Sequence, residues 1–184
     1  MRGILTALCS QASSLRGDAR GIAAVEFALI ALMLILAIMN VADIGYFTYT
    51  RMEVENAAEM GAQQAWKTCN NVMAMLPATT KCSGLNAAIT TAIQGTSLGT
   101  NVSLANGSPS EAYYCVNGSN ALQSVGTVAN PPSDCSAAGN ANASPGDYLL
   151  VSVTYSYTPL FPGITVMSAT GISAITMTSW MRMG

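Results

Sequence analysis

The side chain best placed for specific chemistry is Glu26, a carboxylate in an otherwise apolar run. No residue from Phe27 to Met39 is polar, and the wider span Ile22–Ile44 is long enough to cross a hydrocarbon core of about 30 Å. A carboxylate in such a span costs on the order of 3 kcal/mol. We therefore expect Glu26 to pair with a positive group, supplied by processing of the chain or by a neighbouring subunit. The alternative is that its side chain reaches water at the membrane interface.

Four cysteines that follow the apolar run could form disulfides: Cys69, Cys82, Cys115 and Cys135. An even number of cysteines in an exported domain is typical of a disulfide framework, and four cysteines allow three pairings. We favour the local pairing, Cys69 with Cys82 and Cys115 with Cys135, because it would clip the end of a helix and a long polar loop. Buried free thiols are an alternative. A zinc site would need closely spaced cysteine pairs, which the sequence lacks.

The segment Gly95–Gly99 matches G-x-S-x-G, the sequence that carries the nucleophilic serine of many hydrolases. That serine needs a histidine base, and the chain contains no histidine. We therefore expect Ser97 to lie in an ordinary turn, and we expect no enzymatic activity, no cofactor and no metal site. A net charge of −2 also argues against nucleic acid as a partner.

The residues before the apolar run favour an anchored helix with its N-terminus in the cytoplasm. Met1–Arg20 contains Arg2, Arg16 and Arg20, with Asp18 as its one acid, and a basic segment is the usual cytoplasmic flank of a membrane helix. A cleaved secretory signal is the alternative, but its apolar core would be shorter. Only 9% of residues are charged, which also favours a membrane or assembled state.

The helix is expected to continue beyond the membrane, because Asp43–Trp66 is rich in alanine, glutamate, glutamine and methionine. Within it Ala57, Gly61 and Ala65 are spaced four apart and form a stripe of small residues on one helical face. We expect this stripe to pack on the protein's own sheet. Contact between helices of different subunits is the alternative.

The rest of the chain predicts a small, mostly antiparallel sheet, so the expected fold class is α+β. The clearest strand is Tyr148–Tyr157, where apolar residues alternate with serine and threonine. A short helix is expected over Leu85–Gln94. The other expected elements are strands over Gly99–Leu104, Glu111–Val116, Leu122–Val128 and Ala174–Met181, and a loop over Asn130–Gly146.

The start of the apolar run, Gly-Ile-Ala-Ala-Val-Glu-Phe at residues 21–27, resembles the class III type IV prepilin signal. In particular it resembles that of the TadE-like (TadE/TadG) pseudopilins of the tight-adherence (Tad/Flp) pilus machinery. Glu55–Ala62 is similar to the E-x-A-A-x-x-G-A sequence of that family, and Val153–Pro162 looks like its tail. The specific resemblance covers about Gly21–Ala65 and implies a type IV pilin-like fold.

The resemblance implies processing at named residues. A prepilin peptidase would cut after Gly21, leaving Ile22 as the new N-terminus, with Glu26 and Phe27 as the fifth and sixth residues. The carboxylate would then meet the new amine of an adjacent subunit, because opposite charges attract strongly in a low dielectric. The large domain, and Glu-Phe where major pilins have Glu-Tyr, suit a pseudopilin or minor pilin.

This interpretation fixes an expected location, set of partners and role. The protein would cross the bacterial inner membrane once, with its C-terminal domain in the periplasm, before transfer into an extracellular pilus. Its partners would be other pilins and pseudopilins, the prepilin peptidase, the inner-membrane assembly platform and the lipid bilayer. It would initiate, cap or decorate a pilus used in surface adhesion. The alternative is an uncleaved, membrane-anchored periplasmic binding or adaptor module.

The expected parts of the chain are a leader (1–21), a transmembrane helix (22–44), its periplasmic continuation (45–66) and a disulfide-bearing α+β ectodomain (67–184).

Overall fold

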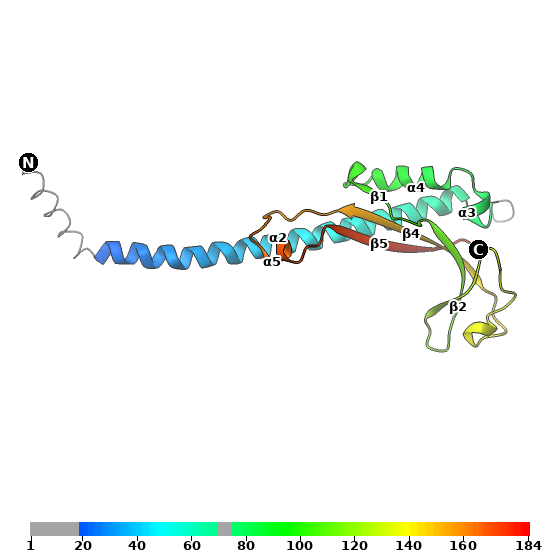
Figure 1. Ribbon diagram of the computed structural model, residues 1–184. Coiled ribbons are helices and arrows are strands. Elements are labelled where there is room, and N and C mark those ends of the chain that lie inside the picture. The colour runs from blue at the N-terminus through cyan, green and yellow to red at the C-terminus, as the bar shows by residue number, and fades with distance from the viewer. Residues whose placement is uncertain (1–18, 70–74) are drawn as a thin grey trace, which may run out of the picture. The chain divides into compact units, whose positions relative to one another are not determined.

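The computed structural model describes residues 19–69 and 75–184 (Figure 1). The chain divides into two compact units. The first comprises the chain up to Gly45 together with Pro159–Thr170, and the second comprises Tyr46–Thr158 with Gly171–Gly184. Most of the expected leader lies outside the described residues.

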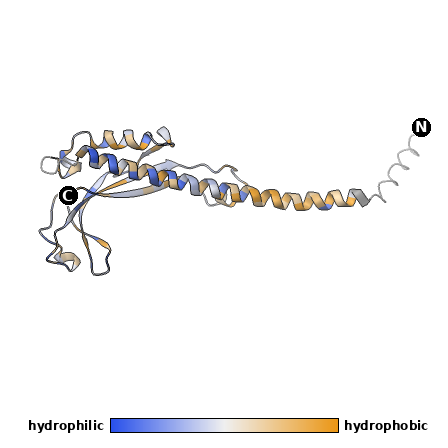
Figure 2. Cartoon of the chain, turned by 180° about the vertical axis from the view of Figure 1, so that it is seen from behind, coloured by the Kyte–Doolittle hydropathy of each residue, from blue (hydrophilic) through white to orange (hydrophobic). Residues whose placement is uncertain are grey.

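Helix α2 (Ala19–Cys69) is continuous over 51 residues and contributes to both units. Its composition changes along its length, from hydrophobic residues in the N-terminal half to hydrophilic ones further on (Figure 2). In the first half the apolar side chains are exposed, with Phe27 at 74% and Met33 at 77%. By length and composition, this helix could cross a membrane, and it is the one described helix of which that is true.

The first unit also contains the segment Pro159–Thr170, with the short helix α5 (Val166–Ala169) lying beside α2 (Figure 1). Asn40 and Asp43 of α2 bind this segment through hydrogen bonds. Two parts of the chain that are far apart in sequence therefore meet at the end of the apolar run.

The second unit is built on an antiparallel sheet around one long strand, β4 (Gly146–Ser156). Strand β5 pairs along nearly the whole of one edge of β4, whereas β2 and β1 share the other edge, at its N-terminal and C-terminal halves respectively. Strand β3 pairs with β2. The remaining strands are β1 (Val102–Leu104), β2 (Ser110–Val116), β3 (Leu122–Thr127) and β5 (Ala174–Arg182).

The core of the second unit forms where α2 meets α4 (Leu85–Gln94) and the inner face of β4. Residues i and i+2 of a strand share one face, which is why Leu149, Val151 and Val153 are all fully buried while the intervening residues are not. Most other fully buried members come from the two helices: Val54, Ala57, Ala58, Ala62, Ala65, Cys69, Ile89 and Ile93. Val102 of β1 and Ala78 complete the set.

The predicted α+β fold, a long N-terminal helix followed by a small antiparallel sheet domain, is confirmed. Helix α4 has the predicted bounds, and β5 ends one residue later than predicted. The strand predicted over Gly99–Leu104 is wrong in its first half, because Gly99–Asn101 forms a 3-10 turn and Gly99 adopts a φ of +57°. The predicted loop Asn130–Gly146 contains a 3-10 turn, η3 (Ser136–Ala138). The short helices α3 (Ala78–Lys81) and α5 have no counterpart in the prediction.

Candidate functional site

The expected cleavage position lies at the beginning of helix α2. Because α2 begins at Ala19, the bond between Gly21 and Ile22 falls in its first turn. A Cβ atom added to Gly21 would have no neighbour within 4 Å among the described residues. Glycine inside a helix costs roughly 0.5–1 kcal/mol relative to alanine. Packing in the described chain therefore gives no reason for glycine at this position, which is compatible with a requirement imposed by another protein.

The carboxylate of Glu26 lies one helical turn beyond Ile22, about 6 Å along the helix axis. Ile22 is 65% exposed, and Glu26 and Phe27 are exposed as well. From Ile22 to Thr50 the sequence has no lysine or arginine. A cation that neutralises Glu26 inside a membrane must therefore come from the N-terminal side of the helix or from another molecule.

A second polar group of α2, Asp43, is fully buried at the other end of the apolar run. Its carboxylate accepts a hydrogen bond from the Leu160 amide at 2.8 Å and another from the Thr165 hydroxyl. One turn earlier, Asn40 accepts a hydrogen bond from the Val166 amide, also at 2.8 Å. We call these contacts the clasp. The sequence identified Asn40 and Asp43 only as polar residues at the end of the apolar span. It gave no sign of the clasp, because the partners of Asp43 lie more than a hundred residues further along the chain.

The small-residue stripe is occupied by the protein's own second unit. A Cβ atom on Gly61 would lie 2.9 Å from a methyl of Ile93, 3.1 Å from one of Ile89 and 3.2 Å from one of Val151. The alanines on either side of it in the stripe are fully buried. Helix α4 and strand β4 therefore both approach α2 at this glycine, and a subunit contact would have to use another face of the helix.

The structure contains two disulfides, Cys69–Cys82 and Cys115–Cys135, with Cα–Cα distances of 5.8 Å and 5.7 Å. This is the local pairing favoured from the sequence. The first bond ties the end of α2 to the segment before α4. The second ties β2 to the loop that contains η3, and both of its cysteines are buried.

A pair of carboxyl groups lies on the adjacent strands β2 and β4. Glu111 of β2 accepts hydrogen bonds from the backbone amides of Ala78 at 2.7 Å and Thr79 at 2.8 Å, and so caps the N-terminus of α3. Asp147 of β4 is 5% exposed. Burial is the main cause that raises the pKa of Asp147 to about 7. Electrostatic repulsion from Glu111 and a hydrogen bond to Glu111 raise it further. At neutral pH, Asp147 therefore carries a proton for much of the time. No pattern in the sequence indicated this pair.

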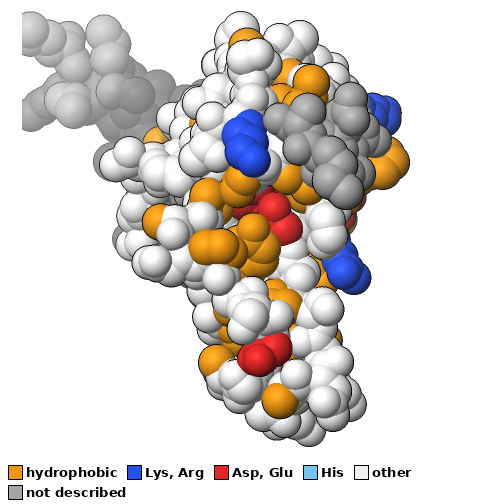
Figure 3. All heavy atoms as spheres, turned by 90° about the vertical axis from the view of Figure 1, so that its right-hand side faces the viewer, with side chains coloured by type: hydrophobic (Ala, Val, Ile, Leu, Met, Phe, Trp, Pro, Cys, Tyr) orange, Lys and Arg blue, Asp and Glu red, His pale blue; other side chains and the backbone are white. Residues whose placement is uncertain are grey.

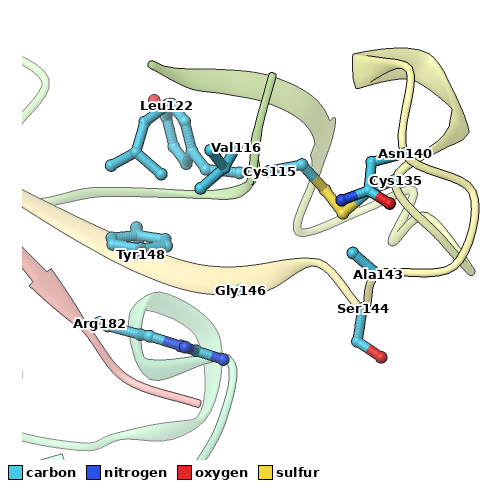
Figure 4. Close-up of a pocket in the computed structure, with 11 residues that line it drawn as sticks. Cys115, Val116, Leu122, Cys135, Asn140, Ala143, Ser144, Gly146, Tyr148 and Arg182 are labelled. Carbon is cyan, nitrogen blue, oxygen red and sulfur yellow. A yellow bond between two sulfur atoms is a disulfide. The ribbon is translucent and has the colours of Figure 1, made fainter. Parts of the chain in front are cut away.

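A hollow of about 230 Å³ lies beside the second disulfide (Figure 4). Its rim carries part of an aromatic cluster, in which Tyr114 packs edge-on against Tyr148 and Trp180 with ring centroids 5.7 Å and 5.0 Å away. Arg182 lines the same hollow and donates a hydrogen bond from Nε to the Gly184 carbonyl at 3.0 Å. Figure 3 shows one face of the molecule, where charged side chains are few and lie among hydrophobic and uncharged ones.

The serine of the G-x-S-x-G segment binds a glutamate of α2. Ser97 follows helix α4 in a turn, as expected, and its hydroxyl donates a hydrogen bond to the carboxylate of Glu53. With no histidine in the sequence, no base of the hydrolase type is available to this serine. In the described parts of the chain, no group of three His, Cys, Asp or Glu residues is arranged to hold a metal ion.

Comparison with known proteins identifies a relationship in the helix. The model of a family described as TadE-like protein matches residues 21–63. The resemblance predicted from the residues of this segment is confirmed. The match covers the expected cleavage position, Glu26 and most of the small-residue stripe, and it ends before the first disulfide. No curated protein and no solved structure matches the chain.

Proposed function

We propose that this chain is a pseudopilin or minor pilin that initiates, caps or decorates a Tad/Flp-type pilus used in surface adhesion. The observation that carries the proposal is the TadE-like match over residues 21–63, which coincides with an exposed apolar helix bearing one carboxylate near its start. The TadE-like family is structural and non-enzymatic. The proposed role is therefore assembly through helix packing.

In the precursor, α2 holds the protein in the inner membrane. The apolar residues exposed in the first unit would be covered by lipid, since burial of apolar surface is worth about 25 cal/mol per Å². The three arginines before Gly21 favour an N-terminus in the cytoplasm, which leaves the second unit in the periplasm.

Processing then supplies a positively charged group that can pair with the Glu26 carboxylate. Cleavage after Gly21 by a prepilin peptidase converts the Ile22 nitrogen into an ammonium group. A carboxylate and an ammonium 4 Å apart attract by about 4 kcal/mol at an effective dielectric constant of 20. Pairing of Glu26 with the Ile22 amine of a neighbouring subunit would fix the register in which the helices pack, with the assembly platform as the place where they meet.

The test is N-terminal sequencing of the mature protein, which should begin at Ile22. Gly21→Trp should block the change in mass, whereas Gly45→Trp should not. Gly45 is the matched control because it also lies in α2 and an added Cβ would have no neighbour within 4 Å. Glu26→Gln should be processed but should fail to enter assemblies. A mature protein that retains Met1 would contradict the processing step.

A second candidate function is that of an uncleaved, membrane-anchored binding module. The hollow beside Cys115–Cys135, with aromatic side chains and an arginine at its rim, is the observation in its favour. This function requires an intact leader and tolerance of Glu26→Ala. The same sequencing experiment therefore separates the two candidates.

A further inference from the structure

The segment Pro159–Thr170 of the first unit presents exposed apolar side chains. It contains no charged residue. Leu160, Ile164 and Val166 are exposed at 49%, 55% and 64%. Large apolar residues clustered on so short a stretch usually mark a contact with a partner or a membrane.

The clasp fixes this segment at one depth along the apolar helix. From Ile22 to Asp43 the helix rises about 32 Å, close to the thickness of a hydrocarbon core. Asn40 and Asp43, which bind the segment, therefore lie where the proposed span leaves the bilayer. The exposed apolar side chains of the segment belong to the same compact unit as the span.

The polar groups of the segment are largely bonded within the unit. The Gly163 amide donates to the Ser168 hydroxyl at 2.5 Å, and the Thr170 hydroxyl donates to the Met167 carbonyl at 2.6 Å. The Ile164 amide donates to the Phe161 carbonyl at 3.3 Å. Backbone groups satisfied internally can enter a region of low water content at little cost, whereas unsatisfied groups cannot.

We propose that Pro159–Thr170 is a second membrane-contacting element, which sits in the lipid interface at the periplasmic end of the α2 span. This inference rests on the proposed function, because it requires that α2 crosses the bilayer. The buried Asp43 holds the element on the helix rather than facing lipid. Lipid is favoured over a protein partner because the segment is uncharged and is fastened at the depth of the membrane boundary.

The test places nitroxide labels on the full-length chain in phosphatidylcholine–phosphatidylglycerol vesicles, in a Cys9→Ser background. The label goes on Ile164→Cys, with Leu32→Cys as the reference inside the span and Ser119→Cys as the exposed reference in the β2–β3 turn. Collisions with oxygen, which concentrates in lipid, are compared with collisions with a water-soluble nickel chelate. We expect nickel accessibility at position 164 to be several-fold lower than at position 119.

The three label positions distinguish an error in this inference from an error in the proposal that α2 crosses the membrane. If nickel reaches position 164 as readily as 119 while 32 is protected, the inference is wrong and the span stands. If nickel reaches position 32 as well, the span is wrong too. Protection of position 164 only when other pilin subunits are added would mean a protein contact and would overturn the lipid assignment.

A second measurement tests the clasp directly. Asp43→Ala in the labelled chain should raise both nickel accessibility and label mobility at position 164, while the label at 32 stays protected. Asn40→Ala removes one hydrogen bond to the segment, from the Val166 amide, together with the bond from the Asn40 side chain to the Leu36 carbonyl within α2. It is the milder variant and should have a smaller effect in the same direction. Unchanged spectra in both variants would overturn the claim that these two residues hold the element in place.

Discussion

Replacement of Asp147 by asparagine should make the second unit much more stable at pH 8, moderately more stable at pH 5 and almost unchanged below about pH 4. In the folded protein, burial and the neighbouring Glu111 raise the pKa of Asp147 to about 7, from an ordinary value of 3.8. The folded state therefore binds this proton more tightly than the unfolded state. The stabilisation is fully present below about pH 4 and is lost as the pH rises through 7.

The size of the effect follows from the two pKa values. A shift of one unit corresponds to 1.36 kcal/mol, so a change from 3.8 to about 7 is worth about 4 kcal/mol. Most of it should be lost between pH 5 and 8, where no histidine can titrate because the chain has none. Tyr113, which faces the pair, has its pKa raised by burial and then by Asp147 and Glu111, so it stays neutral throughout.

Asparagine keeps the shape of the protonated carboxyl group and can donate a hydrogen bond to Glu111, but it cannot ionise. Urea denaturation at each pH, followed by the fluorescence of Trp66 and Trp180 with the disulfides intact, gives the free energy of unfolding. The wild-type value should fall between pH 5 and 8, and the Asp147→Asn value should stay nearly level.

The control is Asp134→Asn. A hydrogen bond from Ser136 lowers the pKa of Asp134, so this side chain is ionised throughout the window and its replacement should leave the slope unchanged. A wild-type profile that is flat from pH 5 to 8, or an Asp147→Asn variant less stable than wild type at pH 8, would refute the reasoning.

Three further outcomes are expected in denaturation experiments. Gly61→Ala should lower the free energy of unfolding by about 1 kcal/mol, because overpacking against three methyls outweighs a gain in helix propensity of about 1 kcal/mol. Gly45→Ala, where the added methyl meets open space, should show only the gain. A gain in both variants would mean that the core side chains move aside at little cost. Cys69→Ser with Cys82→Ser should lower stability by about 3 kcal/mol, as estimated for a loop of this length, and an unchanged melting temperature would contradict a stabilising role. Ser97→Ala should cost about 1 kcal/mol through the lost hydrogen bond to a glutamate of α2, and loss of a hydrolytic activity in this variant would contradict the turn assignment.

Features set by local pattern could be predicted from the sequence. The alternation along Tyr148–Tyr157 identified β4 and its buried face, because a strand buried on one side must alternate. The bounds of helix α4 followed from its apolar spacing and from Gly95 at its end. The favoured disulfide pairing matches the structure because cysteines close in sequence needed only short loops to meet.

Features that depend on distant partners could not be predicted. The clasp joins Asp43 to Leu160 and Thr165, and neither side of the contact has a local signature. The carboxyl pair forms because β2 and β4 are adjacent in an order that the sequence did not specify. At Gly99 the strand expectation failed because a positive φ and a tight turn replaced the extended backbone that the neighbouring residues favour.

The order of the two disulfides along the chain bears on how the protein is made. The first cysteine of the second unit bonds to the second, and the third bonds to the fourth. If the second unit crosses a membrane in the order of its sequence, Cys69 emerges just ahead of Cys82 and Cys115 just ahead of Cys135. An oxidase that joins cysteines as they emerge would form the native bonds directly, so maturation should depend on a thiol oxidase and need little help from a disulfide isomerase.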